Sequence, residues 1–324
     1  MSAILSWVTE TAIRRMKKNK SRPQLAEVLS VCSHIVPLAV EPHMVFLTCF
    51  LTFEAASEDE YGLIRSVCTI VANTSSCAGA EAFDVYKRAQ VQLMQLTCVA
   101  PLQYLEGIVQ ALASVIQKVT FDEVIVASML EKAVVLLQVY AQSHEADKLP
   151  SVFRSLALIG YLCYFFDFEK LKTLKFRSET DEPFSKQLFD ICSALYVLFK
   201  ENEEGRDRVL ESISYIWLRY NYLLTECEDM LLQALRRCDS PPSIKRTLQM
   251  IHKLFQGNGS RTATMKARPL VNEAQIALLV PKLFDKLEQY ARHRNDEVRY
   301  WSFTLIRLFS DKGFANHTKV WLRV

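Results

Sequence analysis

Helical periodicity runs through the whole chain, and this feature most limits what the sequence can fold into. Apolar residues recur at three- and four-residue spacing from end to end, and no stretch of sustained apolar/polar alternation competes with them. Glycine is scarce, with 8 in 324 residues, whereas its usual share is about 7%. The sequence therefore predicts an all-α protein, and it argues against glycine-rich β-architectures and against doubly wound folds with glycine-rich phosphate turns.

Helix starts are marked by residues that suit a first turn. Three segments match the capping box, in which a hydroxyl accepts the N3 amide and a glutamate reaches back to the N-cap amide: Ser57–Glu60, Thr120–Glu123 and Thr225–Glu228. Prolines also fall where first turns would begin, at Pro23, Pro42, Pro101, Pro150 and Pro241. We expect fourteen helices, near residues 3–18, 23–37, 42–56, 58–72, 80–98, 101–118, 121–142, 150–166, 183–201, 206–222, 226–238, 241–256, 272–292 and 296–311.

Most of the expected connections are short, and a run of helical pairs joined in this way is typical of stacked α-repeats. Two connections are longer. Residues 167–182 are charged and irregular, and residues 257–269 are polar and basic and contain two glycines. Because composition does not change across either connection, we expect a single α-solenoid over residues 1–324, with a flexible loop near 257–269.

A weak internal pattern accompanies this helical run. Arg65, Arg154 and Arg299 each follow a large apolar residue, and a small residue comes three positions after each arginine. Positions four apart share a helix face, so the apolar and the small residue should both be buried between helices. The arginine should then lie at the rim of that face, where it can bond the preceding turn or a neighbouring acid.

The stretch Leu279–Phe309 resembles a HEAT repeat. It has a first helix carrying Pro281, a polar turn, and a second helix that opens Asp-x-Val-Arg at Asp296, Val298 and Arg299. The resemblance implies an α-solenoid of the HEAT/armadillo class, a right-handed superhelix of antiparallel helix pairs. Families of this class include nuclear transport receptors, phosphatase scaffold subunits and regulatory subunits of condensin and cohesin.

The cysteines and the apolar runs bear on the compartment. Nine cysteines are scattered along the chain and no two are spaced as CxxC, which favours reduced thiols in an intracellular protein. The apolar start, Met1–Val8, is too short for a signal-peptide core. Two long uncharged runs are residues 89–104, which contain a proline, and residues 155–166, and neither fits a bilayer-spanning helix, so we expect no membrane span.

No sequence motif indicates an enzyme. The chain has no GxxxxGK[ST] phosphate loop, no HExxH and no GxSxG, and its one G-x-G, at residues 257–259, follows an expected helix instead of a strand. Six histidines lie far apart, and none has the spacing of a metal site. We expect no catalytic residue, no cofactor and no metal ion.

One feature exceeds the background: a basic run near the amino terminus. Residues 14–22 hold six positive charges, and the only acid among residues 1–22 is Glu10. The run is a solvated helix end, a nuclear localisation signal at residues 17–20, or a contact for the phosphates of nucleic acid or anionic lipid. As a candidate contact surface it comprises Arg14, Arg15, Lys17, Lys18, Lys20 and Arg22.

The carboxy-terminal end of the expected helical stack is apolar. Solenoids need a polar terminal cap, but few residues follow the last expected helix and they include Trp321. We expect an exposed apolar end made of Trp301, Leu305, Phe309 and Trp321. Such an end indicates a fragment or isoform of a longer repeat protein, or a docking site for a partner.

These features favour a non-enzymatic protein–protein interaction scaffold, located in the nucleus rather than the cytoplasm. Its expected role is chromosome-associated, as a factor like the condensin or cohesin regulators or a meiotic chromosome factor. Two alternatives stay open. The first is a nuclear transport or cytoplasmic adaptor solenoid, and the second is a helical enzyme whose site is assembled from scattered residues.

Overall fold

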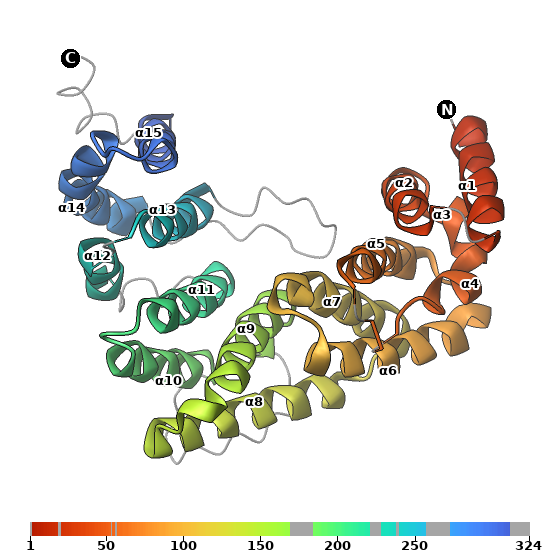
Figure 1. Cartoon of the computed structure of the whole chain (residues 1–324), viewed down its shortest axis with the longest axis horizontal. Coiled ribbons are helices and arrows are strands. Elements are labelled where there is room, and N and C mark those ends of the chain that lie inside the picture. The colour runs from red at the N-terminus through yellow and green to blue at the C-terminus, as the bar shows by residue number, and fades with distance from the viewer. Residues whose placement is uncertain are drawn as a thin grey trace. The chain divides into compact units, whose positions relative to one another are not determined.

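The computed structural model describes residues 2–18, 21–52, 54–55, 57–168, 184–220, 228–237, 240–256 and 273–311. Helices make up nearly all of these residues, and the described part of the chain contains no β-strand. The protein is therefore all-α, as the helical periodicity predicts (Figure 1). Its many packed helices are compatible with a helical repeat fold.

The α-helices have these bounds: α1 Ser2–Lys17, α2 Arg22–Ile35, α3 Pro37–Val40, α4 Met44–Thr48, α5 Glu58–Thr74, α6 Phe83–Val99, α7 Leu102–Val115, α8 Glu123–Ser143, α9 Leu149–Phe165, α10 Phe184–Leu198, α11 Glu203–Arg219, α12 Glu228–Arg237, α13 Pro241–Gln256, α14 Glu273–Ala291 and α15 Asp296–Asp311. Short 3-10 turns lie between several of them, and a π-helical turn, Ile116–Thr120, follows α7.

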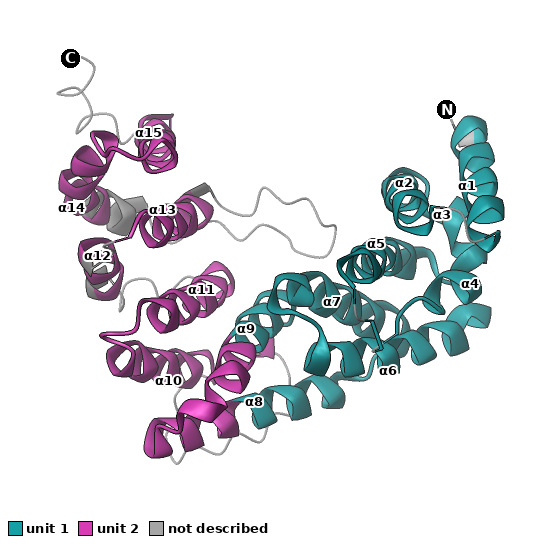
Figure 2. Ribbon diagram, viewed as in Figure 1, with its two compact units in different colours: residues 1–133, 157–166, 171–175 teal, residues 134–156, 167–170, 176–324 magenta. Residues whose placement is uncertain are grey.

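The chain divides into two compact units (Figure 2). The first holds the described residues up to Ala133 together with Ala157–Phe166, and the second holds Val134–Leu156 and the described residues from Asp167 onward. In the first unit α1 packs on α2, α2 on α5, and α5 and α6 on α7. In the second unit α10 packs on α11, α11 on α13, and α13 and α14 on α15. Most of these contacts join helices that are neighbours or next-neighbours in the chain, and α2 reaches α5 past the short α3 and α4.

The capping boxes have different outcomes. Ser57 caps α5 as predicted, since its hydroxyl accepts the Glu60 amide and the Glu60 carboxylate accepts the Ser57 amide. The prediction at Thr120 is wrong: this residue ends the π-helical turn, and Phe121 takes a left-handed conformation with φ of 51°. Asp122 instead accepts a backbone hydrogen bond from Ile125 at the start of α8. The predicted box at residues 225–228 begins outside the described residues.

The predicted helix over residues 42–56 is also wrong, because the chain turns repeatedly in this stretch. A 3-10 turn at Glu41–His43 leads into the short α4. The amides of Phe50 and Leu51 then bond carbonyls three residues back, which tightens the end of α4 and buries Leu51 completely. The pattern of apolar residues could not reveal this, since a tight turn buries Leu51 as well as a helix would.

The internal arginine pattern has the predicted burial. All six flanking positions are at most 9% exposed: Ile64, Cys68, Phe153, Ala157, Val298 and Ser302. Arg299 bonds the preceding turn, donating to the carbonyls of His293 (2.9 Å) and Arg294 (3.0 Å), and pairs with Asp296. Local helix geometry therefore determines both the inward face and the rim. The predicted loop at 257–269 and most of the connection at 167–182 lie outside the described residues.

Candidate interaction surfaces

Helix α1 presents most of the predicted basic surface. One face of α1 is held against the core, with Ala12, Ile13 and Met16 at most 4% exposed, and α1 packs on α2 and α3. Arg14, Arg15, Lys17 and Lys18 are all exposed. Residues 14–18 of the basic run therefore lie at the carboxy-terminal end of a docked helix, where cations suit the negative end of the helix dipole.

The basic residues divide into two groups with different surroundings. Lys17 lies over the ring of Phe46 (5.6 Å to the centroid), and Arg22 lies over Phe50 (5.2 Å) and donates to the Met16 carbonyl (3.3 Å). These two cations attach the end of α1 and the start of α2 to α4 and to the residues just after α4. Lys20 lies outside the described residues.

The second group comprises Arg14, Arg15 and Lys18, which project into solvent. No ion pair or side-chain hydrogen bond joins any of the three to another residue in the described part of the chain. Glu10, the acid in α1, is directed at His43, with its Oε1 3.4 Å from the imidazole Nε2. The three cations therefore present a positive surface that no described residue neutralises.

Exposed apolar side chains on α1 were missed by the sequence reasoning. Ile4 and Trp7 are 67% and 68% exposed. A tryptophan side chain is usually well buried, because burial of its large ring is favourable. Tryptophan is also enriched among the interface residues that contribute most to binding energy. A helical-wheel reading would have found these residues, since positions 4, 7, 11, 14 and 18 share one face of a helix.

The predicted apolar end is largely wrong. Leu305 and Phe309 are completely buried, because their face of α15 packs on α13 and α14, and the Phe309 ring meets those of Phe255 (5.0 Å between centroids) and Phe284 (6.1 Å). Trp301 is half-buried and its ring makes an edge contact with His252 (5.5 Å). Trp321 lies outside the described residues. The large apolar side chains that α15 exposes are those of Tyr300 (64%) and Phe303 (58%).

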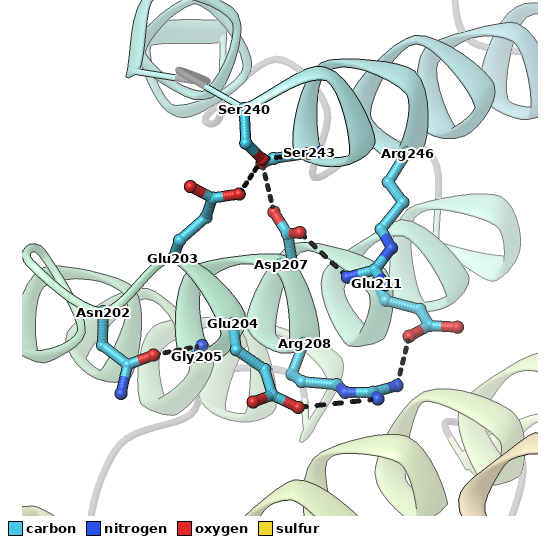
Figure 3. Close-up of polar contacts among 10 residues, drawn as sticks. All are labelled: Asn202, Glu203, Glu204, Gly205, Asp207, Arg208, Glu211, Ser240, Ser243 and Arg246. Atoms are coloured by element: carbon cyan, nitrogen blue, oxygen red, sulfur yellow. Dashed lines mark hydrogen bonds and ion pairs between the residues drawn. The ribbon is translucent and has the colours of Figure 1, made fainter. Parts of the chain in front are cut away.

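A polar groove between α11 and α13 is a second feature that the sequence did not reveal (Figure 3). Asn202 starts α11 by accepting the Gly205 amide (2.8 Å), and a side chain at Gly205 would collide with the Phe199 ring. One turn further on, Asp207 points at α13, where its carboxylate accepts from the Ser243 hydroxyl (2.7 Å) and from Arg246 (3.1 Å).

Further polar side chains surround this contact. The Ser240 hydroxyl donates to Glu203, and Arg208 lies 3.8 Å from Glu204 and 3.5 Å from Glu211. The cavity beside them has a volume of about 320 Å³. Asp207 pairs with Arg246 between the two helices, and Arg208 pairs with two acids along α11, so these charges neutralise one another. The cavity is therefore a weaker candidate for a charged ligand than the cations of α1, which have no ion-pair partner among the described residues.

The described residues form no metal-binding cluster, and two of their cysteines are unsuited to thiolate chemistry. No three of their His, Cys, Asp and Glu side chains lie close enough together to hold a metal ion. Burial raises the pKa of Cys68 and of Cys192 to about 12, so both stay as thiols at neutral pH, whereas metal ligands and nucleophiles are thiolates.

Helix α8 is the one described helix that is long and apolar enough to cross a membrane by length and composition. Core helices pass the same test, and on α8 the side chains of Leu130, Val134 and Leu137 are completely buried in the protein. The charged pair Glu131 and Lys132 falls in the middle of the helix. These features are consistent with the predicted absence of a membrane span.

Comparisons with known proteins do not assign the chain. No protein-family model matches it, and no curated protein is significantly similar to it in sequence. The function is therefore inferred from the surfaces described above.

Proposed function

We propose that this protein is a HEAT/armadillo-type α-solenoid that acts as a non-enzymatic protein–protein interaction scaffold. The observation that carries the proposed interaction function is the outward face of α1, where Arg14, Arg15 and Lys18 have no described partner and Trp7 is exposed. An uncompensated positive surface steers an oppositely charged partner, and an exposed indole supplies the apolar contact that holds it. The partner is a protein that presents an acidic segment.

We further propose a nuclear, chromosome-associated role. Support comes from the Lys-Lys-Asn-Lys pattern at residues 17–20 and from the resemblance of Leu279–Phe309 to a HEAT repeat, whose second helix, with Val298 and Arg299 before an apolar run, is similar to those of condensin-type subunits. In this stretch α14 and α15 pack on each other as a helix pair, and Arg299 bonds the turn between them. Imaging of the tagged chain, with and without charge reversal at Lys17 and Lys18, tests the location.

The binding proposal is tested by affinity capture from nuclear and cytoplasmic extracts. The test variant reverses Arg14, Arg15 and Lys18 to Glu, which leaves the cation–ring contacts of Lys17 and Arg22 in place. A matched control reverses three other exposed cations, Lys132, Arg236 and Arg294.

We expect nuclear partners to be captured by the unaltered chain and by the control, and to be depleted about tenfold or more by the test variant. Equal capture by both variants would contradict a contact through α1. Capture of cytoplasmic partners alone would contradict the nuclear role and favour the adaptor alternative.

A further inference from the structure

The outward face of α1 carries apolar and cationic side chains one after the other along its length. Ile4 and Trp7 lie near its start, while Arg14 and Lys18 lie on the same face two and three turns later. At 1.5 Å per residue, Trp7 and Arg14 are about 10 Å apart along the helix axis, and Ile4 and Lys18 about 21 Å. A ligand that uses the whole face must match this order and spacing.

We propose that this face binds an amphipathic acidic helix of a partner protein, so the inference rests on the proposed scaffold function and names the partner's chemistry. The partner helix carries carboxylates that pair with Arg14 and Lys18. It also carries large apolar side chains about two turns away, which pack on Trp7 and Ile4. The charge is complementary because no described acid neutralises Arg14, Arg15 or Lys18.

The helix dipole sets the direction of the partner. Carboxylates are most favourable in the first turn of a helix, and cations in the last turn. The cations of α1 are near its carboxy-terminal end. A partner helix with acids at its own amino-terminal end therefore places them on Arg14 and Lys18 when it runs antiparallel to α1, and its apolar residues then reach Trp7.

An anionic membrane fits this face less well. A helix that lies in a lipid interface carries apolar side chains along its whole length and cations at the flanks. On α1 the apolar and cationic side chains follow one another on a single stripe, and the rest of the apolar surface, including Ile13 and Met16, is buried in the protein. Only the first two turns would reach lipid.

A synthetic peptide of about 18 residues, about 27 Å long as a helix, serves as the probe. It has three glutamates in its first two turns and Leu and Phe two turns further on, on the same face. One control peptide has the same composition with Leu and Phe moved two positions, which turns them to the opposite face. A second control exchanges the acidic and apolar halves. Calorimetry on the full chain gives the Kd at about 0.1 M and about 1 M salt, where the Debye length is roughly 10 Å and roughly 3 Å.

The ionic contact at Arg14 and Lys18 and the apolar contact at Trp7 should differ in their salt dependence. We expect the Arg14→Glu/Lys18→Glu variant to weaken binding about tenfold at low salt and to remove most of the salt dependence. Trp7→Ala should weaken binding about tenfold at both salt concentrations and leave the salt dependence unchanged. Two controls should bind like the unaltered chain: Lys132→Glu/Arg294→Glu, and Phe303→Ala, which removes another exposed aromatic ring (58%, against 68% for Trp7).

Several outcomes would overturn the inference: equal binding of all three peptides, binding that ignores Trp7, or Trp7-dependent binding to phosphatidylserine vesicles without peptide binding. Failure of the proposed function is distinguishable. If charge reversal depletes partners from extracts but the peptide does not bind, the inference falls and the scaffold function stands. If the peptide binds as expected but capture from extracts ignores the charge reversal, the scaffold contact through α1 falls instead.

Discussion

Asp207 lies in the first half of α11 with its side chain only 7% exposed. A carboxylate buried to this extent is costly unless it is paired and hydrogen-bonded. Here one oxygen accepts from Ser243 and the other from Arg246. The nearby Arg208 pairs along its own helix with Glu204 and Glu211, which are far more exposed. The polar contact between α11 and α13 therefore depends chiefly on Asp207.

Replacing this carboxylate should destabilise the protein. We expect Asp207→Ala to lower the free energy of unfolding by about 1–3 kcal/mol, because the Ser243 hydroxyl is buried and loses its acceptor. Urea unfolding followed by circular dichroism measures the change. Glu204→Ala is the control and should cost less than about 0.5 kcal/mol, since its ion pair is on the surface. Equal losses of unfolding free energy in the two variants would show that the buried contact contributes no more than a surface ion pair.

At the level of single elements, α8 shows how a helix start depends on its surroundings. The Thr120 hydroxyl, the cap predicted from sequence, is buried without a hydrogen-bond partner among the described residues. Asp122 caps α8 instead, and its carboxylate also accepts from Lys87 of α6 at 2.8 Å. That ammonium group lowers the pKa of the Asp122 carboxyl below its ordinary value of 3.8.

This assignment predicts opposite results for the two residues. Asp122→Ala should cost about 1–2 kcal/mol at neutral pH, whereas Thr120→Val, which removes only the unpartnered hydroxyl, should be neutral or stabilising. Because the Asp122 pKa is lowered in the folded state, its contribution is present above the ordinary value and is lost as the pH falls through the folded-state value. Urea unfolding at pH 7 and in acid tests both points. If Thr120→Val lowered the free energy of unfolding more than Asp122→Ala, Thr120 would be the cap of α8, as the sequence predicts.

The two faces of α15 also differ strongly in burial. Phe309 is completely buried between Phe255 and Phe284, whereas Phe303 is 58% exposed. Truncating a buried phenylalanine leaves a cavity that its neighbours fill only in part.

We expect Phe309→Ala to lower the free energy of unfolding by about 3–5 kcal/mol. Phe303→Ala should change it by less than about 0.5 kcal/mol, as is usual for surface substitutions. Thermal and urea unfolding give both values. Similar losses at the two positions would mean that the face of α15 that carries Phe309 is not buried as described.

On the scale of the whole molecule, the buried thiols tie stability to alkaline pH. Cys68 in α5 and Cys192 in α10 are completely buried, one in each compact unit, and burial raises the pKa of both from 9.0 to about 12. In the unfolded chain they ionise near the ordinary value. Each thiol therefore favours the folded state less and less as the pH rises above that value.

The slope of the free energy of unfolding against pH is predictable. At pH values well above 9.0 and well below about 12, each buried thiol should lower the free energy of unfolding by about 1.4 kcal/mol per pH unit. Cys68→Ala and Cys192→Ala should each reduce the slope of stability against pH by that amount, whatever their effect at neutral pH. Cys98→Ala, at an exposed position, is the control. Unfolding measured from pH 8 to pH 10.5 tests this, and identical slopes in all variants would contradict the burial of the thiols.

Several features of this protein follow from the sequence by itself. The helical class, most helix positions, the Ser57 cap, the burial of the residues that flank Arg65, Arg154 and Arg299, and the bond from Arg299 to its preceding turn are all as predicted. Each of these depends on side chains within about two turns of one another. The 3.6-residue period and the unsatisfied amides at a helix start therefore determine them locally.

Other features were decided only by the tertiary structure. Lys17 lies on the Phe46 ring in α4 and Arg22 on the Phe50 ring just after α4, while Arg14, Arg15 and Lys18 face solvent, although all five belong to one basic run. Asp207 meets Ser243 and Arg246, 36 and 39 residues further along the chain. Leu305 and Phe309 are covered by α13 and α14. Local patterns specify which face of a helix is apolar, but which helix covers that face depends on contacts between segments far apart in sequence.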